Sequence, residues 1–168
     1  RPLPPAQTPT ACAPGLLPVI PSHTPVEYPR QPQVTIGECA SLLSDGGLLS
    51  LSFVNRHAEV LRQVWLRGDP SGALDRLQDG SFCAGLFDIG GQAYSAEEVS
   101  AWLPPLGLTV TAVCGVRAFA DQVPEERLDE PAFLDALLRL ESAVARLDPY
   151  RWMARYVHLL ARKDVELS

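Results

Sequence analysis

The segment Ser44-Asp45-Gly46-Gly47-Leu48-Leu49-Ser50-Leu51-Ser52-Phe53-Val54-Asn55 indicates the fold class. Residues 48–54 form an apolar run of the length expected for a buried strand, and the run ends at Asn55. The glycine pair at 46–47 is expected to end a preceding helix, because glycine readily adopts the left-handed backbone conformation at which helices commonly end. In that helix apolar side chains recur three and four residues apart: Ile36, Cys39, Ala40 and Leu43. A helix that leads through a glycine turn into an apolar strand is typical of an α/β fold.

Further helices and strands are predicted after this unit. Residues 57–66 have the pattern of a short amphipathic helix, and a second short helix is expected through Leu74 and Leu77. The glycine-containing stretch 79–93 is expected to be a loop. Ser95-x-x-Glu98 is a capping box that opens the next helix.

Two more strands and a long helix complete the prediction. The strands are expected over 108–117 and 156–163, and the helix starts at Asp129 and Pro131. The long helix has an apolar stripe expected to face the core: Phe133, Leu137, Leu140, Val144 and Leu147. The tryptophans Trp65, Trp102 and Trp152 are also expected to pack in the core.

Residues 1–34 are a different kind of polypeptide. Ten of the 16 prolines lie within residues 1–32. Each proline lacks a backbone N–H and biases the preceding residue toward extended geometry, so we expect neither a helix nor a central strand there. The segment is expected to be irregular or disordered, with a polyproline ligand for SH3 or WW domains as the alternative. The predicted organisation is therefore a Pro-rich segment, 1–34, followed by a folded part, 35–168.

Composition excludes several functional classes. The formal net charge of −6 argues against a general nucleic-acid coat, which needs an excess of lysine and arginine. No apolar stretch approaches the 18 residues of a membrane span, so no membrane association is expected. The cysteines and histidines are scattered and lack the spacing of a zinc or redox site, so we expect no bound metal and a reducing, cytoplasmic location. These residues are Cys12, Cys39, Cys83, Cys114, His23, His57 and His158.

Several segments resemble a known enzyme family. Residues 44–55 resemble the Gly-Gly turn, apolar strand and aromatic-x-Asn passage at the fifth strand of class I S-adenosylmethionine-dependent methyltransferases. Three further segments are similar to the bacterial tRNA 5-carboxymethoxyuridine methyltransferases. They are Gly115-Val116-Arg117-Ala118-Phe119-Ala120-Asp121, Leu137-Leu138-Arg139-Leu140-Glu141, and the stretch from Asp148-Pro149-Tyr150 through Ala154-Arg155-Tyr156-Val157-His158 to Ala161-Arg162-Lys163. The resemblance covers about residues 35–163.

The resemblance implies a sheet of seven strands in the order 3-2-1-4-5-7-6, with the last strand antiparallel. On this template residues 48–55 are strand 5, 108–117 are strand 6 and 156–163 are strand 7. The first four strands have no counterpart, and no G-x-G-x-x-G turn occurs in the chain. The sequence therefore predicts a partial, Rossmann-like methyltransferase sheet with flanking helices and an uncovered edge at strand 5. This chain alone is expected to bind no S-adenosylmethionine and to be a truncated or fragmentary form.

Four residues are candidates for binding the substrate, whereas no catalytic residue is identified. A carboxylate methyl acceptor is already ionised at neutral pH, so it needs alignment more than a general base. Arg117 is the best candidate to hold such a carboxylate; the alternative is a structural pairing with an acid such as Asp121. Arg155 and Tyr156 could add a charge and a stacking ring. Asn55 lies where ligands bind in open α/β sheets, or else caps the following helix.

Two short basic runs are candidates for tRNA binding. Residues 150–163 hold four cations and no acid, and the helix over 57–66 is flanked by or contains Arg56, Arg62 and Arg67. Such runs are more often solvated faces than phosphate sites.

Two functional hypotheses follow. The first is a methyltransferase-family protein without its cofactor half, whose complete relatives methylate a tRNA wobble-uridine carboxylate or a small molecule. The alternative is a non-catalytic α/β module that docks on a partner through the Pro-rich segment or the exposed strand edge.

Overall fold

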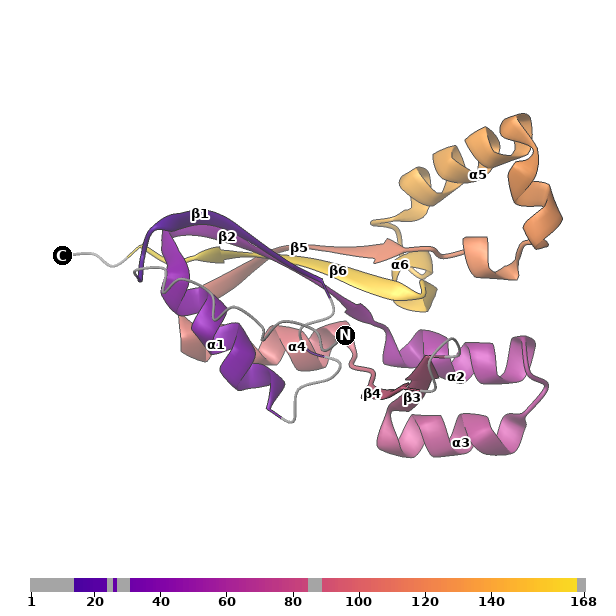
Figure 1. Ribbon diagram of the computed structural model, residues 1–168, viewed down its shortest axis with the longest axis horizontal. Coiled ribbons are helices and arrows are strands. Elements are labelled where there is room, and N and C mark those ends of the chain that lie inside the picture. Colours follow the sequence, from indigo (N-terminus) through magenta and orange to yellow (C-terminus); the bar gives the residue numbers. More distant parts are fainter. Residues whose placement is uncertain (1–13, 24–25, 27–30, 85–88, 166–168) are drawn as a thin grey trace, which may run out of the picture.

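The described residues form a four-stranded sheet with helices around it (Figure 1). The computed structural model describes residues 14–23, 26, 31–84 and 89–165. The strand order is β1 (Leu17–His23), β2 (Leu43–Val54), β6 (Tyr156–Lys163) and β5 (Leu108–Val116). β1 is parallel to β2, and β6 is antiparallel to both of its neighbours. The three predicted strands and the α/β fold class are therefore confirmed, but β2 begins at Leu43 and not at 48, so the glycine pair at 46–47 lies inside the strand and does not end the helix.

The expectation that residues 1–34 are irregular is wrong for residues 17–23, which form the edge strand β1 beside β2. Pro18 lies at a shift in the β1–β2 register, and Pro21 lies in an edge strand, where proline is tolerated because a strand there pairs on one side only. The predicted uncovered edge at β2 is wrong for the same reason. Residues 1–13 lie outside the described residues, so the disorder expected of them remains a prediction.

One face of the sheet is covered by two helices, α1 (Pro32–Leu42) and α4 (Ala96–Trp102) (Figure 1). α1 begins at Pro32, earlier than predicted, because proline is well suited to the first helical turn. α4 begins with the predicted Ser95–Glu98 capping box. Alternate residues of the strands face these helices and form the core: Leu49, Leu51, Phe53, Val157, Leu159 and Ala161, packed with Ile36, Ala40, Val99 and Leu103.

The opposite face of the sheet is much less buried. The strand positions that point to it include the half-buried Leu48 and Leu160 and the exposed Val19 and Val116. In Figure 1 no described helix lies over the middle of this face. Two of the three strand pairs are antiparallel, and such sheets can face solvent on one side; this face carries polar side chains such as Ser50 and His158 as well as apolar ones.

Two further helices and a hairpin lie between β2 and α4. The helices are α2 (Arg56–Trp65) and α3 (Pro70–Asp79), as predicted. The stretch 79–93, predicted as a loop, contains the hairpin of β3 (Ser81–Ala84) and β4 (Ile89–Gln92). Trp65 at the end of α2 is exposed, against the core position predicted for it, whereas Trp102 and Trp152 do pack against the core.

The long helix α5 (Pro131–Val144) is followed by the single turn α6 (Tyr150–Met153). α5 projects beyond the end of the sheet on the side away from α2 and α3 (Figure 1). Only part of its apolar stripe is buried: Leu137 and Val144 are, whereas Leu140 is 46% exposed and Leu147, beyond the helix, is 53% exposed. The prediction of a fully core-facing stripe is therefore wrong.

Candidate functional site

Three chain segments meet at the edge of the sheet where β2 and β5 end and β6 begins. Tyr156 is the partner of Val54 on one side and of Val116 on the other. The backbone N–H of Arg155 donates to the carbonyl of Arg117 at 3.1 Å, and the N–H of Asn55 donates to the carbonyl of Arg155 at 3.1 Å. This register brings residues far apart in the sequence to one place, at the edge where ligands bind in open α/β sheets.

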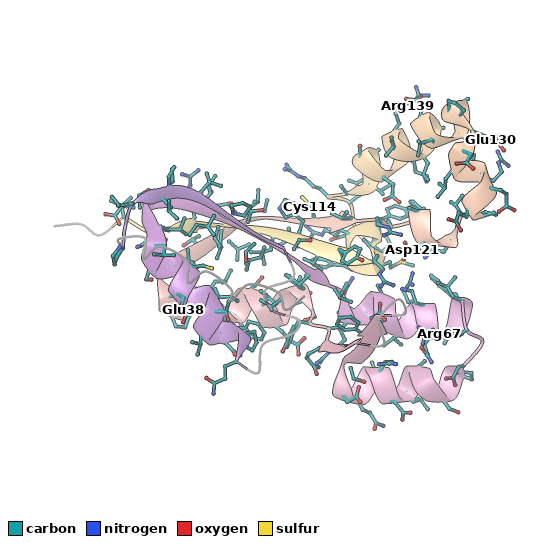
Figure 2. All side chains as sticks on the ribbon, in the orientation of Figure 1. Glu38, Arg67, Cys114, Asp121, Glu130 and Arg139 are labelled. Atoms are coloured by element: carbon teal, nitrogen blue, oxygen red, sulfur yellow. The ribbon has the colours of Figure 1, made fainter. Side chains whose placement is uncertain are left out.

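A pocket of about 410 Å³ opens at this edge. Three of its lining residues, Arg117, Arg155 and Tyr156, were predicted from the sequence as substrate-binding candidates. Figure 2 shows Asp121 in the space between α2 and the chain that leads to α5. The pocket is also lined by Arg62, Asp121 and Glu125.

Asp121 is the centre of the charged network. Its carboxylate is only 6% exposed and pairs with Arg62 and Arg117, and its Oδ2 lies 3.7 Å from Nη1 of Arg155. Glu59 of α2 adds a second carboxylate, whose Oε1 lies 3.6 Å from Nε of Arg62 and 3.3 Å from Nη1 of Arg155. We call Arg62, Arg117 and Arg155 the arginine cluster. Its three cations share two carboxylates.

The arginine cluster is electrostatically crowded. Burial, followed by the neighbouring Arg155 guanidinium, lowers the pKa of Arg62, while Asp121 and Glu59 act in the opposite direction. The Arg117 side chain is 52% exposed, so one cation of the cluster faces solvent. Glu125 at the rim is exposed and carries the opposite charge. An anionic group that entered beside Arg117 would relieve repulsion among the cations, and guanidinium groups bind carboxylates and phosphates bidentately.

The ring of Tyr156 lies under two of these cations. The guanidinium carbon of Arg155 is 5.4 Å from the ring centroid, and that of Arg117 is 6.0 Å away. Both distances are within the range of a cation–π contact. The arrangement offers an aromatic surface beside positive charge, which are the two features that proteins use to hold an unstacked RNA base.

Asn55 supports the site from inside the protein. It is 1% exposed; its Nδ2 donates to the carbonyls of Trp152 and Ala154 at 2.9 and 2.8 Å, and its Oδ1 accepts from the N–H of His57 at 3.1 Å. The capping alternative of the sequence analysis therefore describes its contacts. Asn55 fixes the turn that precedes Arg155 and does not line the pocket.

Sequence reasoning missed the contribution of α2. Arg62 was considered only as part of a basic run, and Glu59 was not singled out; their three-residue spacing on one helix face is the signal that pairs them. The remaining basic residues do not gather at the pocket. Arg162 and Lys163, at the other end of β6, donate to the carbonyls of Gly46 and Leu43.

The described residues show no glycine turn of the kind that binds a nucleotide-type cofactor. Cofactor sites of nucleotide-binding folds use a glycine-rich turn that leaves a strand and opens a helix. Among the described residues five glycines have positive φ, and none of the five stands between a strand and a helix that follows it. The same part of the chain contains no group of three or more His, Cys, Asp or Glu side chains placed to hold a metal ion, and no helix there could span a membrane.

Comparison with known proteins places the fold. No family model matches the chain. The tRNA 5-carboxymethoxyuridine methyltransferase of Escherichia coli K12 is 29% identical over 147 residues, which are 84% of this chain and 52% of the relative. The match to the same enzyme of E. coli O157:H7 has the same values. The chain resembles the C-terminal half of a class I S-adenosylmethionine-dependent methyltransferase.

Solved methyltransferase structures share this fold. An S-adenosylmethionine-dependent methyltransferase from Listeria monocytogenes matches with a TM-score of 0.57 at 14% identity, over 93% of this chain and 65% of its own. One from Methanosarcina mazei matches with a TM-score of 0.54 at 13% identity, over 94% and 64%. The chain thus spans about half the length of the curated methyltransferases it matches and less than two thirds of these structures.

Proposed function

We propose that this chain is the acceptor-binding half of a tRNA methyltransferase. On this proposal the arginine cluster holds the anionic part of the acceptor, either a carboxylate on the modified base or a phosphate beside it. The observation that carries the proposal is the convergence of Arg62, Arg117 and Arg155, from three separate segments, on one pocket beside Tyr156. The similarity to an enzyme named for a carboxylate-bearing uridine supports the carboxylate in particular.

Each residue has a defined task in this proposal. Arg117 is half-exposed and meets the incoming anion first, while Arg155 and Arg62 lie deeper beside Asp121 and Glu59. Tyr156 offers a ring on which a base can stack. A carboxylate needs no general base, so the contribution of these residues is to orient the acceptor and to remove water from it.

We propose that the less buried sheet face packs against the polypeptide that binds the cofactor, in the same chain or another. Two of its exposed positions, Val19 and Val116, are apolar, whereas the exposed Thr109 and Arg162 are polar. β1 and β2 form a parallel pair, and parallel pairs are most common in sheets with both faces covered. The greater length of the curated relatives is consistent with such a second half. Titration calorimetry with S-adenosylmethionine tests this division: we expect no binding by this chain, and micromolar binding would refute it.

The same face also supports a second candidate function, a non-catalytic module that docks on a partner protein. The methyltransferase function requires the arginine cluster to bind the acceptor, whereas a docking module has no need of it. Tight tRNA binding favours the methyltransferase, whereas a monodisperse protein that binds neither tRNA nor the cofactor favours the module.

A tRNA-binding measurement with matched arginine variants tests the proposed function. We expect binding that weakens with salt, and a loss of about 10- to 150-fold in Arg155→Gln, since a charge-assisted contact contributes roughly 1.5–3 kcal/mol. Arg162→Gln removes the same charge at the far end of β6, the strand that Arg155 directly precedes, and is expected to bind as the wild type does. Equal losses in both variants would indicate non-specific attraction and refute the site.

A further inference from the structure

The turn that carries Arg117 and Asp121 is held by a residue outside the pocket. The carboxylate of Glu141, on α5, accepts hydrogen bonds from three successive backbone N–H groups. The distances are 2.8 Å from Ala118, 2.8 Å from Phe119 and 2.9 Å from Ala120. Successive N–H groups that converge in this way form a concave anion-binding nest, and here the anion is part of the protein.

The held turn lies between two members of the charged network. Arg117 directly precedes the three N–H groups, and Asp121 directly follows them. The backbone of Arg117 has φ of +61°, the left-handed region that a bulky L-residue avoids unless its surroundings impose it. The Glu141 carboxylate is part of what imposes it, because the three hydrogen bonds fix the direction of the chain immediately after Arg117.

The contact also joins α5 to the site. A second hydrogen bond, from the N–H of Gly115 to the carbonyl of Ala145 at 2.7 Å, ties the end of this helical segment to β5. Hydrogen bonds to α5 and to the residue that follows it therefore hold the chain both before and after Arg117, although α5 lies beyond the end of the sheet in Figure 1.

We propose that Glu141 is a positioning residue for the acceptor site, acting through the 118–120 turn to set the direction of Arg117. This proposal rests on the proposed function, since it assigns Glu141 a role in binding the anionic acceptor. Glu141 touches no acceptor itself; it sets the place from which Arg117 does.

Glu141→Gln is the test variant, and Asp135→Asn is its matched control. The glutamine amide presents an NH2 group where one carboxylate oxygen accepted, so at least one of the three hydrogen bonds is lost and the others become weaker. Asp135 lies on the same helix and loses the same charge, but within the described part of the chain its ion pair is with the exposed Arg139 and it does not contact the 118–120 turn. Both variants are made in the full chain.

The first measurement needs no RNA. Amide hydrogen exchange at Ala118, Phe119 and Ala120 is expected to be slow in the wild type, at least about tenfold faster in Glu141→Gln, and unchanged in Asp135→Asn. Rapid exchange at these amides in the wild type would overturn the proposal even if the glutamine variant failed to fold.

The second measurement is tRNA affinity over a series of salt concentrations. We expect Glu141→Gln to bind tRNA about tenfold more weakly. If the anion beside Arg117 is a phosphate, the slope of log affinity against log salt also falls by roughly 0.7–0.9, the value for one lost phosphate contact; if it is the base carboxylate, the loss is confined to tRNA that carries the carboxylate. A variant that is only less stable contains less active protein but keeps the wild-type slope. Adding Glu141→Gln to Arg117→Gln is expected to have no further effect.

The two proposals fail separately. If the wild type binds tRNA without salt dependence, or not at all, the proposed function is wrong whatever the exchange rates show. If binding depends on Arg155 but Glu141→Gln keeps the wild-type affinity, or weakens binding equally in the Arg117→Gln background, the role of Glu141 is overturned and the arginine cluster stands.

Discussion

Replacement of Asn55 by alanine is expected to destabilise the protein strongly, although Asn55 does not line the pocket. Its side chain caps α2 and donates to the carbonyls of Trp152 and Ala154. Loss of an N-cap costs about 1 kcal/mol. The carbonyl of Ala154, a fully buried residue, is left without this donor, at about 1–3 kcal/mol. The sum is roughly 2–4 kcal/mol, or about 4–16 °C in melting temperature for a domain of this size.

Asn55→Asp separates the two parts of this effect. The introduced carboxyl keeps an oxygen for the N-cap but faces two carbonyl oxygens, so the folded protein favours its neutral form and its pKa is raised above the reference value near 3.9. The folded state then binds more protons than the unfolded state, and stability falls as the pH rises from about 4 through the folded pKa.

Denaturant unfolding followed by circular dichroism at a series of pH values measures both variants. We expect a free-energy difference between wild type and Asn55→Asp that grows with pH, and one for Asn55→Ala that stays constant. An Asn55→Ala protein within about 0.5 kcal/mol of the wild type would refute the reasoning, because a surface residue would behave in that way.

Three smaller predictions test other parts of the structure. Ser95→Ala removes the capping box of α4 and is expected to lower stability by about 1 kcal/mol in thermal unfolding; no change would mean that α4 needs no cap. On α5, Leu137→Ala is expected to cost about 2–5 kcal/mol because Leu137 is buried, whereas Leu138→Ala at the exposed neighbour is expected to cost under about 1 kcal/mol; equal costs would contradict the orientation of the helix. Burial, then the nearby Glu38, raises the pKa of the Cys39 thiol, so alkylation by iodoacetamide is expected to be slower at pH 8 than for free cysteine, and equal rates would contradict that environment.

Elements with strong local signals were predictable from the sequence. The apolar runs gave β2, β5 and β6, and Ser95-x-x-Glu98 gave the start of α4, because strand burial and helix capping depend on residues close in sequence. β1 was missed because proline density argues against strands in general, whereas an edge strand tolerates proline. The β3–β4 hairpin was missed because both strands are only four residues long and β4 contains the adjacent glycines Gly90 and Gly91.

The site was only partly predictable, since its geometry is tertiary. Arg117, Arg155 and Tyr156 lie next to strand ends, so the sheet register brings them together. Arg62 joins them because α2 packs against α6, which precedes β6, and no local sequence pattern predicts that contact. The contact of Glu141 with the 118–120 turn spans more than 20 residues and depends on how α5 is placed. Helical periodicity predicts which residues form the apolar stripe of α5, but it does not predict which part of the protein packs against that stripe.

Competition between two tRNA fragments addresses the proposed acceptor site. One fragment carries 5-carboxymethoxyuridine at the wobble position, and the other carries unmodified uridine there. If the arginine cluster binds the acceptor carboxylate, the wild type prefers the carboxylate-bearing fragment by about tenfold, and Arg117→Gln loses that preference while Arg162→Gln keeps it. Equal affinity of the wild type for both fragments would contradict the account.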